Sequence, residues 1–216
     1  MIGSLLYLTA SRPDISYRVG VYAWYQDNLK ESHVIVVKRI IKYVKSTSNF
    51  GVWYDKDTND MLAGYSDADW AGDADNRNST SSGCFLLENN LVFWISEKQN
   101  SISLSTTKAE YIAAGSYCTQ LLWMQKLLLD YDICQKHLTI YCANTNAINI
   151  SKNLVQHSRT KRIEIWHNFI RGLVEDSTSI LSSLALIIKM LISSQNPLDG
   201  CWFEFLWQNI GVISLE

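Results

Sequence analysis

The sequence predicts an α/β fold in which a mixed sheet, an antiparallel meander plus parallel strands, is flanked by helices. Three observations predict it: strand-like runs that follow one another closely, a hairpin turn at Glu88-Asn89-Asn90, and a long helix followed by one more strand and further helices. The expected strands are 50–54, 62–70, 83–87, 91–96 and 138–142, and the helices after the meander are 105–129, 145–153 and 159–175. Consecutive strands followed by helix, strand and helix are typical of a mixed sheet with helices packed on it.

The composition limits the class of protein. The 216 residues are 47% apolar, which is enough for a sizeable core, and the net charge is −2 with a pI of about 6.1. The chain therefore lacks the overall basic charge that is typical of a strong nucleic-acid binder, so any contact with nucleic acid would depend on a local basic patch. The five cysteines show no Cys-x-x-Cys spacing, which argues against a zinc site or a disulfide framework and favours a reducing compartment. We expect no signal peptide.

Three helices are expected before the first strand. They cover 1–10, Pro13 to about Tyr25, and 31–46, where apolar residues recur at helical spacing. The basic residues of the third helix fall largely outside its apolar stripe; they are Lys38, Arg39, Lys42 and Lys45. We interpret them as a solvated helix face rather than as a nucleic-acid patch.

The expected strand 62–70 carries acids where a strand is usually apolar. Because side chains alternate along a strand, Tyr65, Asp67 and Asp69 share one face. Two acids on one face of an inner strand are costly unless a cation or hydrogen bonds satisfy them. One interpretation is a cleft that holds a hard divalent metal, which prefers oxygen ligands. The other is an exposed edge strand or turn with solvated acids.

The long helix that opens at Ser105 carries Glu110 near its start. Thr107 with Glu110 three residues later fits a capping box, in which the glutamate bonds back to the backbone. The functional interpretation is a carboxylate held at the start of a helix that faces the acidic strand. Position along the sequence leaves both interpretations open.

The composition changes after Ser177. Residues 179–194 are nearly all Leu, Ile and Ser, with Lys189 as the one charge and no clear period. The run is shorter than the 18 or so residues needed to span a bilayer. We therefore expect a degenerate, poorly folding tail rather than a membrane anchor.

Several separate motifs resemble one known family. They are Gly64–Gly72, Ser103–Thr106 leading to Ala109-Glu110-Tyr111, and His157–Lys161. In this order and spacing they resemble the ribonuclease H region of copia-type retrotransposon Pol polyproteins. The resemblance covers 1–176 and divides the chain into a helical connection segment such as follows a reverse transcriptase (1–49), a ribonuclease H-like domain (50–176) and the degenerate tail (177–216).

The resemblance implies a ribonuclease H fold with a five-stranded mixed sheet, and cleavage of the RNA strand of an RNA–DNA hybrid. That chemistry uses two Mg²⁺ or Mn²⁺ ions, held by four carboxylates. The first two map onto Asp67 and Glu110, which are the expected catalytic and metal-binding residues. The expected contacts to nucleic acid are Arg77, Lys98, Lys152, His157, Arg159 and Lys161. The resemblance places such proteins in the cytoplasm.

The sequence departs from the family at the other two acids. The third stands where this chain has Ala143, and Asn144 on the other face of the strand is a poor substitute. The fourth is missing from residues 184–199, and a reading-frame slip across about 177–196 is our hypothesis for its loss. We therefore expect a ribonuclease H-like domain without a working site, with a non-catalytic nucleic-acid-binding module as the alternative.

Overall fold

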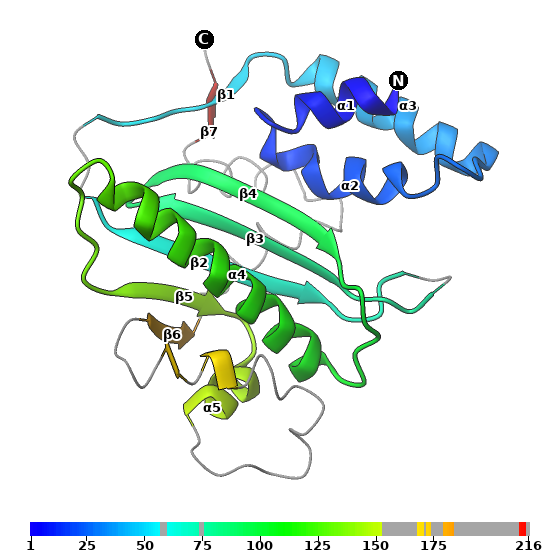
Figure 1. Ribbon diagram of the computed structural model, residues 1–216. Helices are drawn as coiled ribbons and strands as arrows, with labels where there is room; N and C mark the ends of the chain where they lie inside the picture. Colours follow the sequence, from blue (N-terminus) through cyan, green and yellow to red (C-terminus); the bar gives the residue numbers. More distant parts are fainter. Residues whose placement is uncertain are drawn as a thin grey trace. The chain divides into compact units, whose positions relative to one another are not determined.

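The computed structural model describes residues 1–56, 60–73, 76–152, 168–170, 172–173, 179–183 and 212–214. The chain forms two compact units, which divide between Asp55 and Lys56. The first contains the N-terminal helices, and the second contains the main sheet (Figure 1).

The second unit is built on a five-stranded mixed sheet with the order β4-β3-β2-β5-β6. Its strands are β2 (Leu62–Asp69), β3 (Thr80–Leu87), β4 (Asn90–Lys98), β5 (Leu138–Cys142) and β6 (Ser179–Ser183). Strands β2, β3 and β4 pair antiparallel, whereas β5 is parallel to β2 and β6 is parallel to β5. The expected fold class, an antiparallel meander plus parallel strands with flanking helices, is confirmed.

Helix α4 (Thr106–Leu129) runs along one face of this sheet (Figure 1). Its buried side includes Tyr111, Tyr117 and Leu121, which belong to the main hydrophobic core. Tyr117 packs edge-on against Phe85 of β3, with ring centroids 6.0 Å apart. The helix approaches the sheet closely at Gly83, where a Cβ would lie 2.8 Å from the Tyr117 ring. Glycine at this position is therefore a packing requirement.

Strand β6 was not expected from the sequence, which placed residues 179–183 in a degenerate tail. The structure pairs Ser179 to Ser183 in parallel with Leu138 to Cys142. The run forms the edge of the sheet next to β5, and this pairing between segments far apart in sequence is what the local pattern of residues did not predict. The expected helix 159–175 lies mostly outside the described residues, and 168–170 and 172–173 are helical.

The first unit contains the three helices that the sequence predicted: α1 (Ile2–Leu8), α2 (Pro13–Ala23) and α3 (Glu31–Ser46). They share a small core made of Ile2, Leu5, Ile15, Val19, Val37 and Ile40. The four basic residues of α3 are exposed, as the helical spacing predicted. Strand β1 (Phe50–Val52) pairs antiparallel with β7 (Val212–Ser214) in a separate two-stranded sheet.

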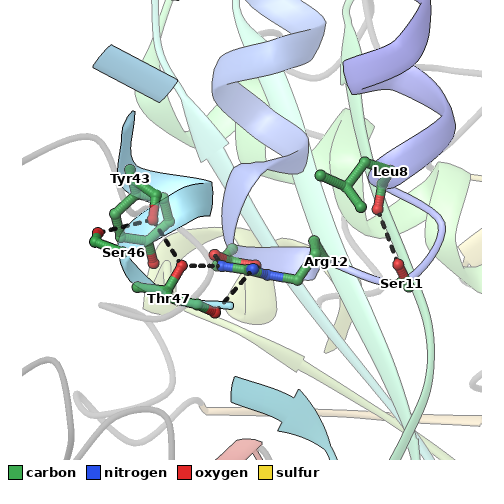
Figure 2. A network of polar contacts seen from close by, with 7 residues as sticks. Leu8, Ser11, Arg12, Tyr43, Ser46 and Thr47 are labelled. Atoms are coloured by element: carbon green, nitrogen blue, oxygen red, sulfur yellow. Dashed lines mark hydrogen bonds and ion pairs between the residues drawn. The ribbon is translucent and has the colours of Figure 1, made fainter. Parts of the chain in front are cut away.

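Arg12 joins the start of α2 to the end of α3 (Figure 2). Its guanidinium donates to both carboxylate oxygens of Asp14, at 2.9 and 2.7 Å. It also donates to the carbonyl and hydroxyl oxygens of Thr47, at 3.2 and 2.7 Å, and lies over the ring of Tyr43. The Arg12–Asp14 pair is buried, so its hydrogen bonds form where water competes poorly. This network accounts for an arginine and an aspartate on either side of Pro13 at the start of α2.

Replacing Arg12 by methionine should destabilise the first unit. The change leaves the Asp14 carboxylate buried without its positively charged partner. An unpaired buried charge lowers the stability more than replacing both partners by apolar residues would. We expect the free energy of unfolding to fall by about 3 kcal/mol, measured by urea denaturation. The matched control is Arg39→Met on the exposed face of α3, which should change it by less than about 0.5 kcal/mol. Equal losses in both variants would contradict this role for Arg12.

Candidate metal and catalytic site

Asp67 lies near the C-terminal end of β2 and is 5% exposed. On one side of β2, Asp67 is paired with Ser82 of β3. On the other side, the preceding residue Ser66 is paired with Cys142, the last residue of β5. Ala143 directly follows Cys142, and Asp67 directly follows Ser66. The two residues therefore come one position after this pair on the neighbouring strands. The solvated-acid interpretation is wrong for Asp67, because its side chain is buried on an inner strand.

Glu110 is also 5% exposed and comes from the start of α4. The helix is capped by Ser105, whose side chain accepts from the backbone N–H of Lys108 at 3.2 Å. The predicted capping box of Thr107 with Glu110 is therefore wrong, because Thr107 already lies inside the helix. Ser105 has the extended backbone that an N-cap requires. The burial of Glu110 thus has a cause other than capping.

Cys142 connects Glu110 to the end of β5. Its Sγ lies 3.8 Å from Oε2 of Glu110, a distance that suits a weak S–H···O hydrogen bond. Burial raises the pKa of Cys142 to about 12, and the neighbouring Glu110 carboxylate acts in the same direction. The thiol is therefore neutral at ordinary pH and donates its proton rather than competing as an anion. Glu110 consequently lies beside the strand end from which Ala143 follows.

Asp67 and Ala143 directly follow the paired residues Ser66 and Cys142, and Glu110 of α4 contacts Cys142. Ala143 offers no ligand atom, and the neighbouring Asn144 is used elsewhere. Its Oδ1 accepts from the backbone N–H groups of Asn146 and Ala147, at 2.9 and 3.1 Å, and so caps α5 (Thr145–Lys152). Among the described residues there is no group of three or more His, Cys, Asp or Glu side chains that could hold a metal ion.

Asp69, the second acid of β2, serves the turn that follows the strand. A Cβ at Gly72 would lie 1.8 Å from Oδ2 of Asp69, so the carboxylate rests directly on the glycine backbone. Ala71 between them has a positive φ of 55°. Only glycine allows this close approach. Asp69 is thereby held at the turn.

Gln99 holds the start of α4, and sequence reasoning did not single it out. Its side chain is buried, and Nε2 donates to Oγ of Ser81 and to the carbonyl of Ala109, both at 2.9 Å. Its Oε1 accepts from Oγ of Ser103 at 3.1 Å. These bonds join β3, the loop before α4 and the residue adjacent to Glu110. A lone glutamine after a strand carries no pattern from which this role could be predicted.

The expected nucleic-acid contacts are distributed unevenly. Arg77 is exposed in the loop between β2 and β3, whereas Lys98 forms an ion pair with the buried Asp73. Lys152 is the last residue of α5. The remaining three lie outside the described residues: His157, Arg159 and Lys161. In the part of the chain that the structure describes, no helix combines the length and apolar character needed to cross a bilayer.

Comparison with known proteins gives the family. No family model matches the chain. The retrovirus-related Pol polyprotein from transposon TNT 1-94 of Nicotiana tabacum is 35% identical over 199 residues, or 92% of this chain and 14% of the relative. Those from transposons RE2 and RE1 of Arabidopsis thaliana are 33% and 34% identical over 100% and 98% of this chain, and 15% and 14% of the relatives. The chain thus spans about one seventh of these relatives.

Solved structures align with the chain at low sequence identity. LC11-RNase H1, isolated from compost, aligns with a TM-score of 0.49 and 9% identity over 62% of this chain and 91% of its own. RNase H1 from Halobacterium salinarum NRC-1 aligns with a TM-score of 0.45 and 8% identity over 62% and 92%.

The order β4-β3-β2-β5-β6, with α4 on one face and buried acids on β2 and α4, defines a ribonuclease H-like domain. Sequence similarity then identifies its origin. The chain belongs to the copia-type retrotransposon Pol polyproteins and is a retrotransposon-derived ribonuclease H-like domain.

The raised pKa of Cys142 predicts a loss of stability in alkali. The thiol ionises near its ordinary pKa of about 8.5 in the unfolded chain but at about 12 in the folded one. Its contribution to stability is therefore complete below about pH 8.5 and is lost as the pH rises toward 12, by at most about 1.4 kcal/mol per pH unit. Urea denaturation between pH 8 and 10.5 should show a shallower decline in Cys142→Ala than in the natural chain. Cys134→Ala, at an exposed thiol, should keep the original slope.

Proposed function

We propose that this domain retains the ribonuclease H frame but has lost two-metal cleavage of RNA–DNA hybrids. The observation that carries the proposal is Ala143, which follows Cys142, the residue that contacts the buried Glu110 and pairs with Ser66, the residue before the buried Asp67. In the family that the chain resembles, an acid occupies this position and completes the ligand set. A methyl group supplies neither charge nor an oxygen atom to a hard cation.

The residues present do not fit a pair of divalent ions. Two Mg²⁺ or Mn²⁺ ions in one site need several shared oxygen ligands, and this site offers two carboxylates among the described residues. Neither neighbour replaces the missing acid, because Asn144 caps α5 and Asp69 is held at the turn by Gly72. The position of the fourth acid falls within residues 184–199, which lie outside the described residues.

A non-catalytic nucleic-acid-binding role is the second candidate. Arg77 is exposed beside the acidic strand and supports a local contact to phosphate. The net charge of −2 and the neutralisation of Lys98 by Asp73 favour weak binding over strong binding. Such binding would take place in the cytoplasm, where proteins of this family act.

The cleavage of an end-labelled RNA–DNA hybrid tests the loss of the site. We expect the natural chain to leave the hybrid intact in Mg²⁺ and in Mn²⁺. Ala143→Asp adds a third carboxylate beside Asp67 and Glu110, so it should bind Mn²⁺ at least about tenfold more tightly, measured by electron paramagnetic resonance. Some return of cleavage in this variant is expected as well.

The matched control is Asn144→Asp. It adds the same charge one residue away, and aspartate keeps the helix-capping role of Asn144. It should therefore change Mn²⁺ affinity little. Mg²⁺-dependent cleavage by the natural chain that disappears in Asp67→Asn would overturn the proposal, because it would mean that the remaining acids are sufficient.

A further inference from the structure

Trp70 is an exposed aromatic residue directly after the acidic strand. Its side chain is 46% exposed, although its indole Nε1 donates to the carbonyl oxygen of Ser103 at 2.9 Å. The ring is therefore held in one orientation while nearly half of its surface remains accessible. A ring that is fixed before binding loses little conformational freedom when a ligand packs against it.

The hydrogen bonds that hold Trp70 continue as far as the residue before Glu110 in the candidate site. Ser103 donates to Oε1 of Gln99, and Gln99 donates to the carbonyl of Ala109, the residue before Glu110. Both Ser103 and Gln99 are buried. The exposed indole and the buried Glu110 carboxylate are thus attached to one hydrogen-bonded frame at the end of β2 and the start of α4.

Two further apolar side chains are exposed on the segment that Trp70 contacts. Ile102 is 57% exposed and Leu104 is 64% exposed, and they flank the buried Ser103. A single exposed apolar side chain is ordinary on a protein surface, whereas several together beside a site indicate a binding surface. We call Trp70, Ile102 and Leu104 the Trp70 platform.

The charges around the Trp70 platform suit a ligand that carries both a flat apolar face and negative charge. Arg77 is exposed in the same loop as Trp70, and Lys108 lies in the first turn of α4. That turn contains no acidic residue, and the start of this 24-residue helix has a positive partial charge. The acids Asp67, Asp73 and Glu110 are buried, and the half-buried Asp69 beside Trp70 is turned toward Gly72, so negative surface here is small. A nucleobase with its attached phosphate has this combination of properties.

We propose that Trp70 stacks against an unpaired base of a nucleic-acid strand that binds across the candidate site. This inference rests on the nucleic-acid binding proposed above and specifies the substrate: a hybrid with a single-stranded extension. Stacking on an aromatic ring depends little on base identity, so the platform selects unpaired structure rather than sequence. Ile102 and Leu104 would cover the edges of the stacked base.

Fluorescence anisotropy with a labelled RNA–DNA hybrid tests the proposal. Two probes are compared, a blunt hybrid and the same hybrid with a short single-stranded extension, in EDTA so that binding is measured without cleavage. We expect Trp70→Ala to weaken binding of the extended hybrid by about five- to tenfold, the range of one partly exposed stacking contact. Binding of the blunt hybrid should change less. The salt dependence should keep its slope, because no charge is removed.

Two variants serve as controls. Trp70→Phe keeps an aromatic ring and should retain most of the affinity. Trp123→Ala removes a 57% exposed indole from the other half of α4 and should bind like the natural chain. Photocrosslinking of 5-iodouracil in the extension to the unaltered chain gives a second measurement, independent of whether a variant folds, and it should label Trp70.

The possible outcomes separate this inference from the proposed binding function. If the natural chain binds neither probe, nucleic-acid binding itself is wrong, and the platform inference fails with it. If the natural chain binds but Trp70→Ala equals Trp123→Ala and Trp70 is not labelled, binding stands and the stacking role is overturned. A platform that served a protein partner would give this last result.

Discussion

The burial of two carboxylates at one junction is the constraint on which the rest of this domain depends. Asp67 from β2 and Glu110 from α4 are both nearly inaccessible to solvent, although burying an ionised carboxylate costs free energy. Their burial requires that β2, β5 and α4 meet in one arrangement. The parallel pairing of Ser66 with Cys142 and the contact of Cys142 with Glu110 supply it.

The surrounding frame is built for rigidity. Gln99 uses its amide to join β3, the loop before α4 and the first turns of that helix. Gly83 allows the Tyr117 ring to approach the sheet, and Gly72 allows the Asp69 carboxylate to rest on the turn backbone. None of these contacts involves position 143. The frame therefore does not depend on the residue at position 143, because fold stability and ligand count depend on different residues.

The neutral thiol of Cys142 shows how the junction accommodates charge. An ionised Cys142 thiol beside Glu110 would place a second negative charge in the protein interior. Burial and the Glu110 carboxylate therefore both raise the pKa of this thiol, which keeps it neutral. The result is a neutral hydrogen-bond donor to the Glu110 carboxylate. A domain with such a junction can remain folded with its acids present and its third ligand absent.

The sequence by itself determined the local elements. Helical spacing predicted α3, alternation and turns predicted the β2–β4 meander, and separated motifs identified Asp67, Glu110 and the loss at Ala143. These features depend on residues close along the chain or on short motifs, so one sequence contains them. The catalytic and metal-binding roles of Asp67 and Glu110 stay proposals.

Only the tertiary structure decided how these elements are used. It assigned the cap of α4 to Ser105 instead of Thr107, placed Ser179–Ser183 in the sheet, and showed that Trp70 shares a frame with Glu110 through Gln99. Each of these depends on contacts between segments far apart in sequence or on competition between neighbouring caps. Periodicity does not report such contacts, because the pairing partner of an edge strand lies far away in sequence and a glutamine that joins three segments looks like any other polar residue.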